Sequence, residues 1–240
     1  MARPLSIENR WDILYRDYPE VYDAFSETPY HPTVYEELPK VVNLQGKDIA
    51  DVGSGTGNSS LALTRYARHV IGIEKEPAML RLAREKSVSA GSGQVTFLAG
   101  DALALPLANA SVNLVVGITL ALYPPEQYRN FILEGLRVAT EQVVYMGIPP
   151  GWYGGELAHI IDDPVVFDYV VEKIFLDEFN FSYQDIFSVQ EYGSLEHIMN
   201  TYGFIFGRRV MDYLKREKKT SILWKFRVYS RGVSQIDVHF

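Results

Sequence analysis

The sequence predicts an α/β fold in which a mostly parallel sheet is covered by helices on both faces. Between residues 44 and 138, short β-rich runs that are apolar on both faces alternate with stretches in which apolar residues recur at helical spacing. Strands of this kind indicate a parallel sheet, because helices then bury both of its sides. The chain has 240 residues, 47% of them hydrophobic, which is enough apolar material for such a core.

The expected elements follow in chain order. Apolar and aromatic residues from Trp11 to Tyr18 recur at helical spacing and Pro19 stops the run, so the first 40 residues predict helices interrupted by prolines. The expected strands are Asp48–Val52, Val70–Ile73, Val95–Leu98, Val112–Gly117 and Val143–Met146. The helices expected between them are Thr56–Arg68, Pro77–Lys86 and Pro125–Val138.

The last part of the chain predicts a different arrangement. Two β-rich runs, Phe204–Tyr213 and Ser221–Tyr229, indicate an antiparallel hairpin that closes the edge of the sheet. The basic residues of this hairpin are interpreted as solvated rather than as a nucleic-acid site: Arg208, Arg209, Lys215, Arg216, Lys218 and Lys219. We expect one domain, divided into an N-terminal helical cap (1–45), a core (46–148), an acidic aromatic insertion (149–190) and a last helix with the closing hairpin (191–230).

Composition excludes several classes of function. There is no cysteine, which excludes disulfides, thiolate metal sites and a cysteine nucleophile, and the five histidines form no close metal-ligand pair, so we expect no metal site. The net charge of −7 has the wrong sign for binding nucleic acid. The longest apolar run, from Val112 to Tyr123, is far shorter than the ~20 residues of a membrane span, and no signal peptide is visible. We therefore expect a cytoplasmic protein; the oligomeric state stays open.

A glycine-rich stretch follows the first expected strand. It reads Asp51-Val52-Gly53-Ser54-Gly55-Thr56-Gly57-Asn58. Glycines at this position allow a sharp strand-to-helix turn and let a ligand approach the bare backbone. The dinucleotide-binding fingerprint would place its third glycine or alanine at position 58, which is Asn58 here. Glu74, at the end of the second expected strand, is well placed to accept both ribose hydroxyls of an adenosine, whereas Asp51 is interpreted as a residue that organises the turn.

Two further stretches complete a recognisable pattern. Gly100-Asp-Ala-Leu-Ala-Leu-Pro106 follows the third expected strand, and the apolar stretch from Val112 to Thr119 comes next. From about Gly46 to Met146 the chain resembles the class I S-adenosylmethionine-dependent methyltransferases. The resemblance is to their small-molecule branch, typified by ubiquinone and menaquinone biosynthesis enzymes. It implies a Rossmann-like, doubly wound sheet of seven strands, S-adenosylmethionine as cofactor and methyl transfer to a small-molecule acceptor.

The resemblance also assigns site residues. The cofactor-binding set that it implies is Asp51, Gly53, Ser54, Gly55, Thr56, Gly57, Glu74, Lys75, Asp101, Ala102, Ile118 and Thr119. In that set the glycines line the methionine and ribose, Glu74 binds the ribose, Lys75 lies beside the adenine, Asp101 and Ala102 read the adenine edge, and Ile118 and Thr119 lie beneath the sulfonium. The chain departs from its relatives at Lys75, where an apolar residue is common, and at Tyr123, where histidine is frequent. Candidates for a general base are His31, in a predicted proline-flanked turn, His159 and Tyr123.

The segment from Gly151 to Gln190 differs in composition from the rest of the chain. It contains eight acids, one base and nine of the 31 aromatic residues, so it carries the whole negative imbalance. Asp162, Asp163 and Pro164 predict the start of an amphipathic helix, with Asp168 and Glu172 opposite its apolar face. We expect residues 156–179 to form a mobile lid over an aromatic acceptor pocket.

The chemistry of the acceptor is open at this point. Carboxylates together with aromatic faces favour cations, which indicates an amine-containing acceptor. The family resemblance instead implies an apolar phenol or a ring carbon. Two other functions remain as alternatives: a nicotinamide-dependent oxidoreductase, and a non-catalytic protein that binds an adenosyl ligand.

Overall fold

A computed structural model describes residues 10–161 and 168–233. The sheet in this part of the chain has seven strands in the order β3-β2-β1-β4-β5-β7-β6. The strands are β1 (Asp48–Val52), β2 (His69–Glu74), β3 (Val95–Ala99), β4 (Val112–Ile118), β5 (Ala139–Gly147), β6 (Ser182–Glu191) and β7 (Ser221–Gly232). Strands β1 to β5 pair in parallel, and β7 is antiparallel to both of its neighbours. The predicted doubly wound sheet is confirmed.

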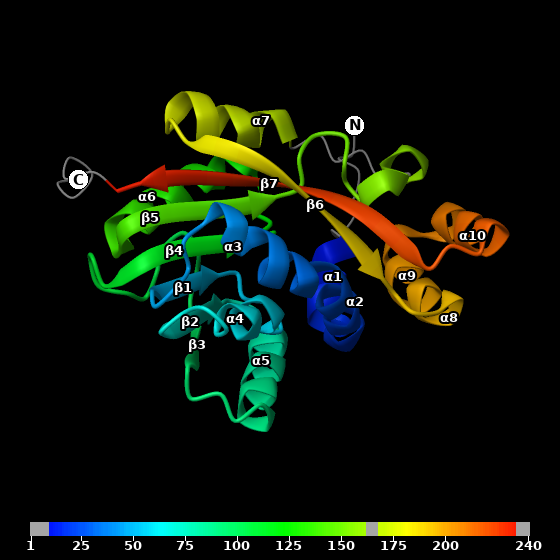
Figure 1. The fold of residues 1–240 in the computed structure, drawn as a ribbon, viewed down its shortest axis with the longest axis horizontal. Coiled ribbons are helices and arrows are strands. Elements are labelled where there is room, and N and C mark those ends of the chain that lie inside the picture. Colours follow the sequence, from blue (N-terminus) through cyan, green and yellow to red (C-terminus); the bar gives the residue numbers. More distant parts are fainter. Residues whose placement is uncertain (1–9, 162–167, 234–240) are drawn as a thin grey trace, which may run out of the picture.

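The helices of the first half are α1 (Arg10–Asp17), α2 (Pro19–Pro32), the π-helical turn η1 (Thr33–Glu37), α3 (Leu38–Val41), α4 (Asn58–Leu63) and α5 (Pro77–Ser89). Those of the second half are η2 (Pro125–Gln127), α6 (Tyr128–Val138), η3 (Gly155–Ile160), α7 (Asp168–Lys173), η4 (Ile174–Glu178), α8 (Leu195–Ile198), η5 (Met199–Gly203), α9 (Phe204–Phe206) and α10 (Arg208–Glu217). Figure 1 shows α3, α4 and α5 in front of the sheet and α6 behind it.

Two apolar cores lie on the two faces of the sheet. In β4, Leu114 and Val116 belong to the core that packs against α2 to α5 and α10, whereas Val115 between them belongs to the core of α6, α7 and η4. All three side chains are at most 2% exposed. Successive strand residues point to opposite faces, so a strand between two helical layers must be apolar throughout. This pattern explains why the sequence predicted the parallel strands correctly.

The predicted hairpin is wrong in its first strand. The partner of β7 is β6, which runs from Ser182 to Glu191, while residues 204–213 form α9 and the first part of α10. Phe206, Val210 and Leu214 are all buried at intervals of four residues, which is helical spacing. The six basic residues assigned to the hairpin lie in α10 or directly after it.

The predicted insertion 149–190 is also not one unit. Its first part forms η3, its middle forms α7 and η4, and its last part is β6 of the sheet. The predicted helix start at Asp162, Asp163 and Pro164 lies outside the described residues. Ile174 and Phe175 are fully buried, and the Phe175 ring stacks on Tyr145 at 4.9 Å, so η4 belongs to the core. A mobile lid therefore stays a prediction for α7.

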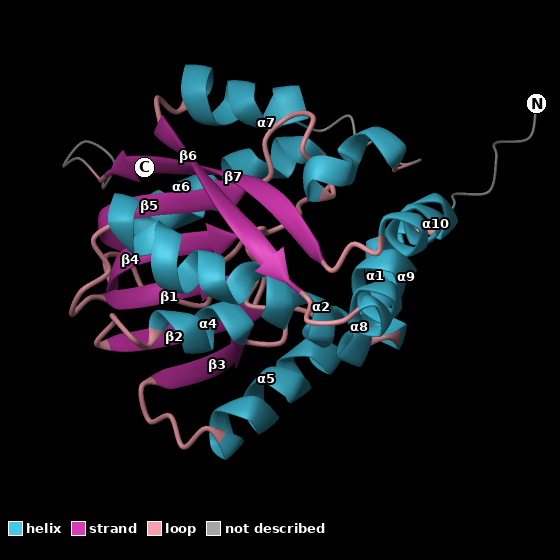
Figure 2. Ribbon diagram, turned by 45° about the vertical axis from the view of Figure 1, so that its right-hand side comes forward, coloured by secondary structure: helices cyan, strands magenta, loops and turns pink. Residues whose placement is uncertain are grey.

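Helices α1 and α2 close one end of the molecule. Trp11 and Phe25 pack edge-on against Phe206, which joins α1 and α2 to the α8–α10 region beside them in Figure 2. The helix break at Pro19 is confirmed, because α1 ends at Asp17 and α2 begins at Pro19. No helix in the described ranges has the length and apolar character needed to span a membrane.

Candidate active site

The glycine-rich stretch forms a tight turn at the carboxyl end of β1. Gly53, Gly55 and Gly57 all have positive φ, between +55° and +85°. A Cβ on Gly53 would lie 2.6 Å from the Leu120 side chain, and one on Gly57 would lie 2.8 Å from the Phe97 ring. The turn therefore requires glycine both for its backbone conformation and for space. Gly57 caps α4 and packs toward α5 and β3, so its role here is to fit the turn to the fold.

Glu74 holds this turn from the end of β2. One carboxylate oxygen accepts a hydrogen bond from the Gly55 N–H at 2.9 Å, and the other accepts one from the Glu76 N–H at 2.8 Å. Burial raises the pKa of the Glu74 carboxyl, and the backbone donors oppose that rise. Each oxygen keeps a second lone pair for a ligand. The sequence placed Glu74 at the ligand but did not predict that it also supports the loop.

Asp51 lies beneath the turn and is fully buried. One of its oxygens accepts hydrogen bonds from the hydroxyls of Ser59, at 2.7 Å, and Ser60, at 2.5 Å. Burial raises the pKa of Asp51 to about 6, although the two serine hydroxyls act in the opposite direction. These contacts connect β1 to α4, which is the organising role expected of Asp51.

A cavity of about 230 Å³ lies over the turn, and we call it the glycine-turn cavity. Seven of the twelve predicted cofactor-binding residues line it: Gly53, Gly55, Glu74, Lys75, Asp101, Ala102 and Thr119. Ser54, Thr56 and Ile118 line a small hollow beside it that shares Gly53 and Thr119. Asp101 is exposed, and one of its oxygens accepts the Leu103 N–H at 2.9 Å, so it also caps the turn that follows β3.

A second cavity, of about 160 Å³, adjoins the first, and we call it the aromatic cavity. Its aromatic lining consists of Trp11, Tyr15, Tyr22, Tyr128, Tyr145, Tyr153 and Tyr229. The two cavities share Tyr15, Tyr22 and residues 119–121. Burial and the nearby Glu172 carboxylate raise the pKa of Tyr229 well above its usual range, so its hydroxyl stays neutral.

The turn after β4 separates the two cavities. Thr119 has φ +50°, which is uncommon outside glycine, and its N–H donates to the Met146 carbonyl at 2.7 Å. The Leu120 carbonyl accepts a hydrogen bond from the Tyr128 hydroxyl at 2.6 Å, and the Tyr145 hydroxyl lies 3.3 Å from the same oxygen. Two tyrosines of the aromatic cavity therefore hold the backbone that divides it from the glycine-turn cavity.

The sequence did not identify the part that α1 and α2 take in the site. Trp11 and Tyr15 on α1 and Tyr22 on α2 line the aromatic cavity, and both tyrosines line the glycine-turn cavity as well. The signal in the sequence was the helical spacing of aromatic residues before Pro19. That spacing indicated packing and did not distinguish a core from a cavity wall.

Two of the three predicted general bases, Tyr123 and His159, line neither cavity. Tyr123 is 69% exposed and lines neither cavity. His159 is exposed, and its ring nitrogen lies 3.2 Å from the Glu156 carbonyl of the same turn. His31 lies in α2 and not in a turn, because the chain remains helical through Pro29 and continues directly into η1; its side chain is outside the described part.

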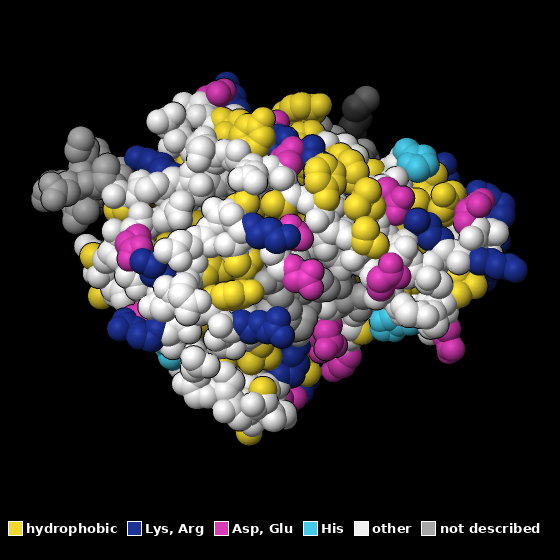
Figure 3. All heavy atoms as spheres, in the orientation of Figure 1, with side chains coloured by type: hydrophobic (Ala, Val, Ile, Leu, Met, Phe, Trp, Pro, Cys, Tyr) yellow, Lys and Arg dark blue, Asp and Glu magenta, His cyan; other side chains and the backbone are white. Residues whose placement is uncertain are grey.

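Four of the eight acids of the acidic segment form ion pairs in the described part of the chain. Glu156 pairs with Lys219 at 3.1 Å, Glu178 with Arg129 at 2.6 Å, and Asp185 with Lys225 at 2.7 Å. Arg227 pairs with both Asp185 and Glu172. In Figure 3, acidic and basic side chains are interspersed on the face shown. The bases come from distant parts of the chain, so these four acidic charges lie beside basic ones in space although they are far from them in the sequence.

Within the described ranges, no group of three or more histidine, aspartate or glutamate side chains is placed to hold a metal ion. The glycine-turn cavity offers bare backbone, carboxylates and an amide-rich loop. This donor set suits an organic ligand with a sugar better than a metal.

Comparison with known proteins supports this interpretation of the site. A family model described as "Methyltransferase domain" matches residues 49–142. The chain is 36% identical over 93 residues to the demethylmenaquinone methyltransferase of Thermobifida fusca, which covers 39% of each protein. It is 41% identical over 56 residues to a 23S rRNA (uracil-C5)-methyltransferase of a Shewanella species, which covers 23% of this chain and 12% of that protein. The chain thus spans well under half the length of these curated relatives.

Solved structures share the fold. The magnesium protoporphyrin IX methyltransferase of Synechocystis, solved with bound S-adenosylhomocysteine, superposes with a TM-score of 0.57 at 18% identity, over 94% of this chain and 93% of that one. At this identity the likeness concerns the fold alone. The methyltransferase-domain model matches residues 49–142, and the glycine turn and the sheet order observed over this stretch agree with that match.

Proposed function

We propose that the protein transfers the methyl group of S-adenosylmethionine to a small-molecule acceptor. The observation that carries this proposal is the pair of adjoining cavities. Tyr15, Tyr22 and Leu120 stand in the wall of both, so a ligand in the glycine-turn cavity and a ligand in the aromatic cavity would meet there. Direct transfer between two bound molecules requires such a junction.

The residues of the glycine-turn cavity fit the cofactor. A Cβ on Gly55 would extend to 3.5 Å from both Met79 and Tyr22, so its absence leaves room for a ligand against the backbone. We assign the ribose hydroxyls to the free lone pairs of Glu74, and the adenine edge to Asp101 and Ala102. Lys75 can cover the purine with its aliphatic stem.

The aromatic cavity favours a flat, uncharged acceptor. Its lining offers ring faces from seven aromatic side chains, and these stack on planar compounds at little cost in conformational entropy. Four carboxylates of the acidic segment are held by basic side chains. A cationic acceptor would also be repelled by the positive sulfur beside it. We therefore propose a neutral aromatic acceptor in place of the amine-containing one.

The protein's contribution to the reaction is alignment and exclusion of water. When bound, S-adenosylmethionine supplies a methyl group on a positively charged sulfur. The Thr119–Ala121 turn and the two tyrosines set the approach of the acceptor to that methyl group. The tyrosine rings also exclude water from the junction, which preserves the electrostatic interactions inside it.

Calorimetry followed by a turnover screen tests the proposal. S-adenosylhomocysteine should bind the purified protein, and a reduced nicotinamide dinucleotide should not. The screen then compares a neutral phenol, a ring-matched amine and an RNA oligonucleotide with labelled S-adenosylmethionine, at low and high salt. Methylation of the phenol supports the proposal.

The other outcomes each contradict a part of it. Methylation of RNA would overturn a small-molecule acceptor. Amine turnover that rises at low salt would overturn an uncharged one. Binding of the cofactor without turnover of any acceptor in a broad aromatic panel would favour a non-catalytic adenosyl-binding protein. Preferential binding of the nicotinamide dinucleotide would favour the oxidoreductase.

A further inference from the structure

Two tyrosine rings from the N-terminal helices meet where the cavities join. The rings of Tyr15 and Tyr22 lie edge to face, with centroids 4.9 Å apart and planes at 82°. Trp11 approaches both, at 5.9 Å and 6.5 Å. Both tyrosines are half-buried, and both line the two cavities. The junction is therefore enclosed by ring faces on the side of α1 and α2.

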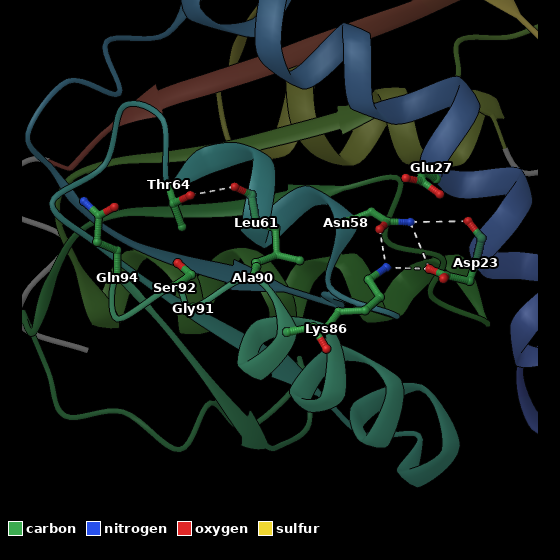
Figure 4. Close-up of a pocket in the computed structure, with 11 residues that line it drawn as sticks. Asp23, Glu27, Asn58, Leu61, Thr64, Lys86, Ala90, Gly91, Ser92 and Gln94 are labelled. Atoms are coloured by element: carbon green, nitrogen blue, oxygen red, sulfur yellow. Dashed lines mark hydrogen bonds and ion pairs between the residues drawn. The ribbon is translucent and has the colours of Figure 1, made fainter.

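A polar cluster holds Tyr22 against the glycine turn. Its neighbour Asp23 accepts hydrogen bonds on one carboxylate oxygen from the Thr56 hydroxyl at 2.5 Å, the Asn58 amide at 3.1 Å and the Lys86 ammonium at 2.6 Å. Figure 4 shows Asn58 and Lys86 converging on Asp23 from α4 and α5. This cluster connects α2 to the turn, and the Tyr22 ring then lies within 3.5 Å of the Cβ position of Gly55.

A second contact fixes α1 beside the aromatic cavity. The Trp11 indole N–H donates to the Tyr153 hydroxyl at 2.8 Å. Tyr153 belongs to the segment after β5, so this hydrogen bond links α1 to that segment in the wall of the cavity. Both helices that carry the tyrosine pair are thus fixed by contacts with other elements.

Methyl transfer removes a positive charge at this junction. The sulfur is cationic before the reaction and neutral afterwards. Aromatic faces attract a cation through the ring quadrupole, and the attraction is stronger when the cation is desolvated. We propose that Tyr15 and Tyr22 recognise the positive charge of the cofactor's sulfonium, so that the site prefers S-adenosylmethionine to its neutral demethylated product. This inference rests on the proposed function. Because the tyrosine pair binds the charged cofactor more tightly than the neutral product, it helps a new cofactor molecule to replace the product after each turnover.

Calorimetry of two leucine variants against both ligands tests the inference. Tyr22→Leu and Tyr15→Leu should each weaken binding of S-adenosylmethionine about five- to thirtyfold, the range that a cation–π contact supplies. Binding of S-adenosylhomocysteine should change by about twofold or less, since that ligand has no charge at sulfur. Tyr22→Phe keeps the ring and should keep most of the preference.

Tyr18→Leu is the matched control. Tyr18 lies between the two helices, is 48% exposed and lines neither cavity, so this variant should bind both ligands like the wild type. Asp12 also lines the glycine-turn cavity, and a carboxylate could favour the cationic ligand as well. Repeating the titrations at high salt separates the two sources, because a preference due to an exposed carboxylate falls with screening while a close ring contact changes little.

Several results would overturn the inference. Equal loss of both ligands in the leucine variants would mean that the rings supply shape and not charge recognition. If Tyr22→Phe lost the preference for S-adenosylmethionine as fully as Tyr22→Leu, the hydroxyl and not the ring would be its source. If the wild-type protein bound neither ligand, the proposed function itself would fail. Retained binding of S-adenosylhomocysteine shows that a variant is folded, and the two independent leucine variants guard against a single misfolded one.

Discussion

The glycine-turn cavity and the aromatic cavity share a wall, but they are built in different ways. The first is formed largely by backbone and strand ends between Gly53 and Leu122, with Glu74 as its central side chain. The second is formed by side chains from α1, α2, α6, β5, α7 and β7, which are distant in the sequence. A cavity made of local backbone can be predicted from a short motif, whereas one made of distant rings depends on the whole fold.

The largest expected effect tests how strictly the backbone of the turn is determined. Gly57→Ala should lower the free energy of unfolding by about 2–4 kcal/mol. Alanine is strained in the left-handed conformation of this residue, and its Cβ would also be too close to its neighbours. The added Cβ would lie 2.8 Å from Phe97 and 3.2 Å from the Ala83 backbone. Chemical denaturation measures the change. Gly91→Ala is the control: it has φ +61° but nothing within 4 Å of its Cβ position, so it carries the strain alone. Equal losses in the two variants would contradict the packing argument.

The buried carboxylate beneath the turn predicts a pH dependence. Asp51 has a pKa of about 6 in the folded protein, against an ordinary value of 3.8. The folded state binds the proton more tightly, so this contribution to stability is complete below pH 3.8 and is lost as pH rises through 6. The free energy of unfolding of Asp51→Asn, measured relative to that of the wild type, should therefore rise by about 2–3 kcal/mol from pH 4 to pH 7. Denaturation curves of both proteins at several pH values measure it, and a constant difference would show that Asp51 titrates normally.

Glu74 tests whether the one side chain central to the glycine-turn cavity binds ligand. Glu74→Ala should weaken binding of S-adenosylhomocysteine by about 1.5–3 kcal/mol, since charge-assisted hydrogen bonds to both the loop and the ribose are lost. Isothermal titration calorimetry measures the affinity. Glu85→Ala removes a glutamate that pairs with Arg81 on the exposed face of α5 and should leave the affinity unchanged. Unaltered affinity in Glu74→Ala would refute the ribose assignment.

A smaller effect is expected on the aromatic side. Tyr128→Phe removes the hydroxyl that donates to the Leu120 carbonyl, which costs about 1 kcal/mol for one hydrogen bond. If the Leu120 turn serves mainly the acceptor, the KM for the acceptor should rise while the affinity for S-adenosylhomocysteine changes little. Tyr123→Phe, on a side chain that lines neither cavity, is the control. If the affinity for S-adenosylhomocysteine fell by a larger factor than KM rose, the turn would serve mainly the glycine-turn cavity.

The smallest effect concerns motion above the aromatic cavity. Amide exchange in α7 should slow when S-adenosylhomocysteine and an acceptor are added, because Val171 lines the cavity. Exchange in η4 should be slow throughout, since Ile174 and Phe175 are fully buried. Mass spectrometry of peptides from the two helices measures both. Equal protection of α7 and η4 without ligand would show that the predicted lid is part of the core.

The errors of the sequence-based prediction have physical causes in particular residues. Strand β6 was missed because its buried positions include Ser188 and Gln190, which look like the exposed positions of a loop or a lid. The stretch 204–213 was taken for a strand because its aromatic and β-branched residues outweighed the four-residue spacing of Phe206, Val210 and Leu214. The acidic segment was interpreted as a surface because ion pairs such as that of Glu178 with Arg129 join residues 49 positions apart.

The sequence by itself determined the parallel core, the glycine turn and the acid that serves it. These features depend on interactions within short stretches: the alternation of strand and helix, the positive φ that only glycine adopts freely, and the strand end that carries Glu74. Only the tertiary structure decided which rings enclose the aromatic cavity and where the charges cancel. Tyr15 and Tyr229 line the same cavity because the fold brings α1 and β7 together there, and the spatial arrangement of elements is not written in the local pattern of any one of them.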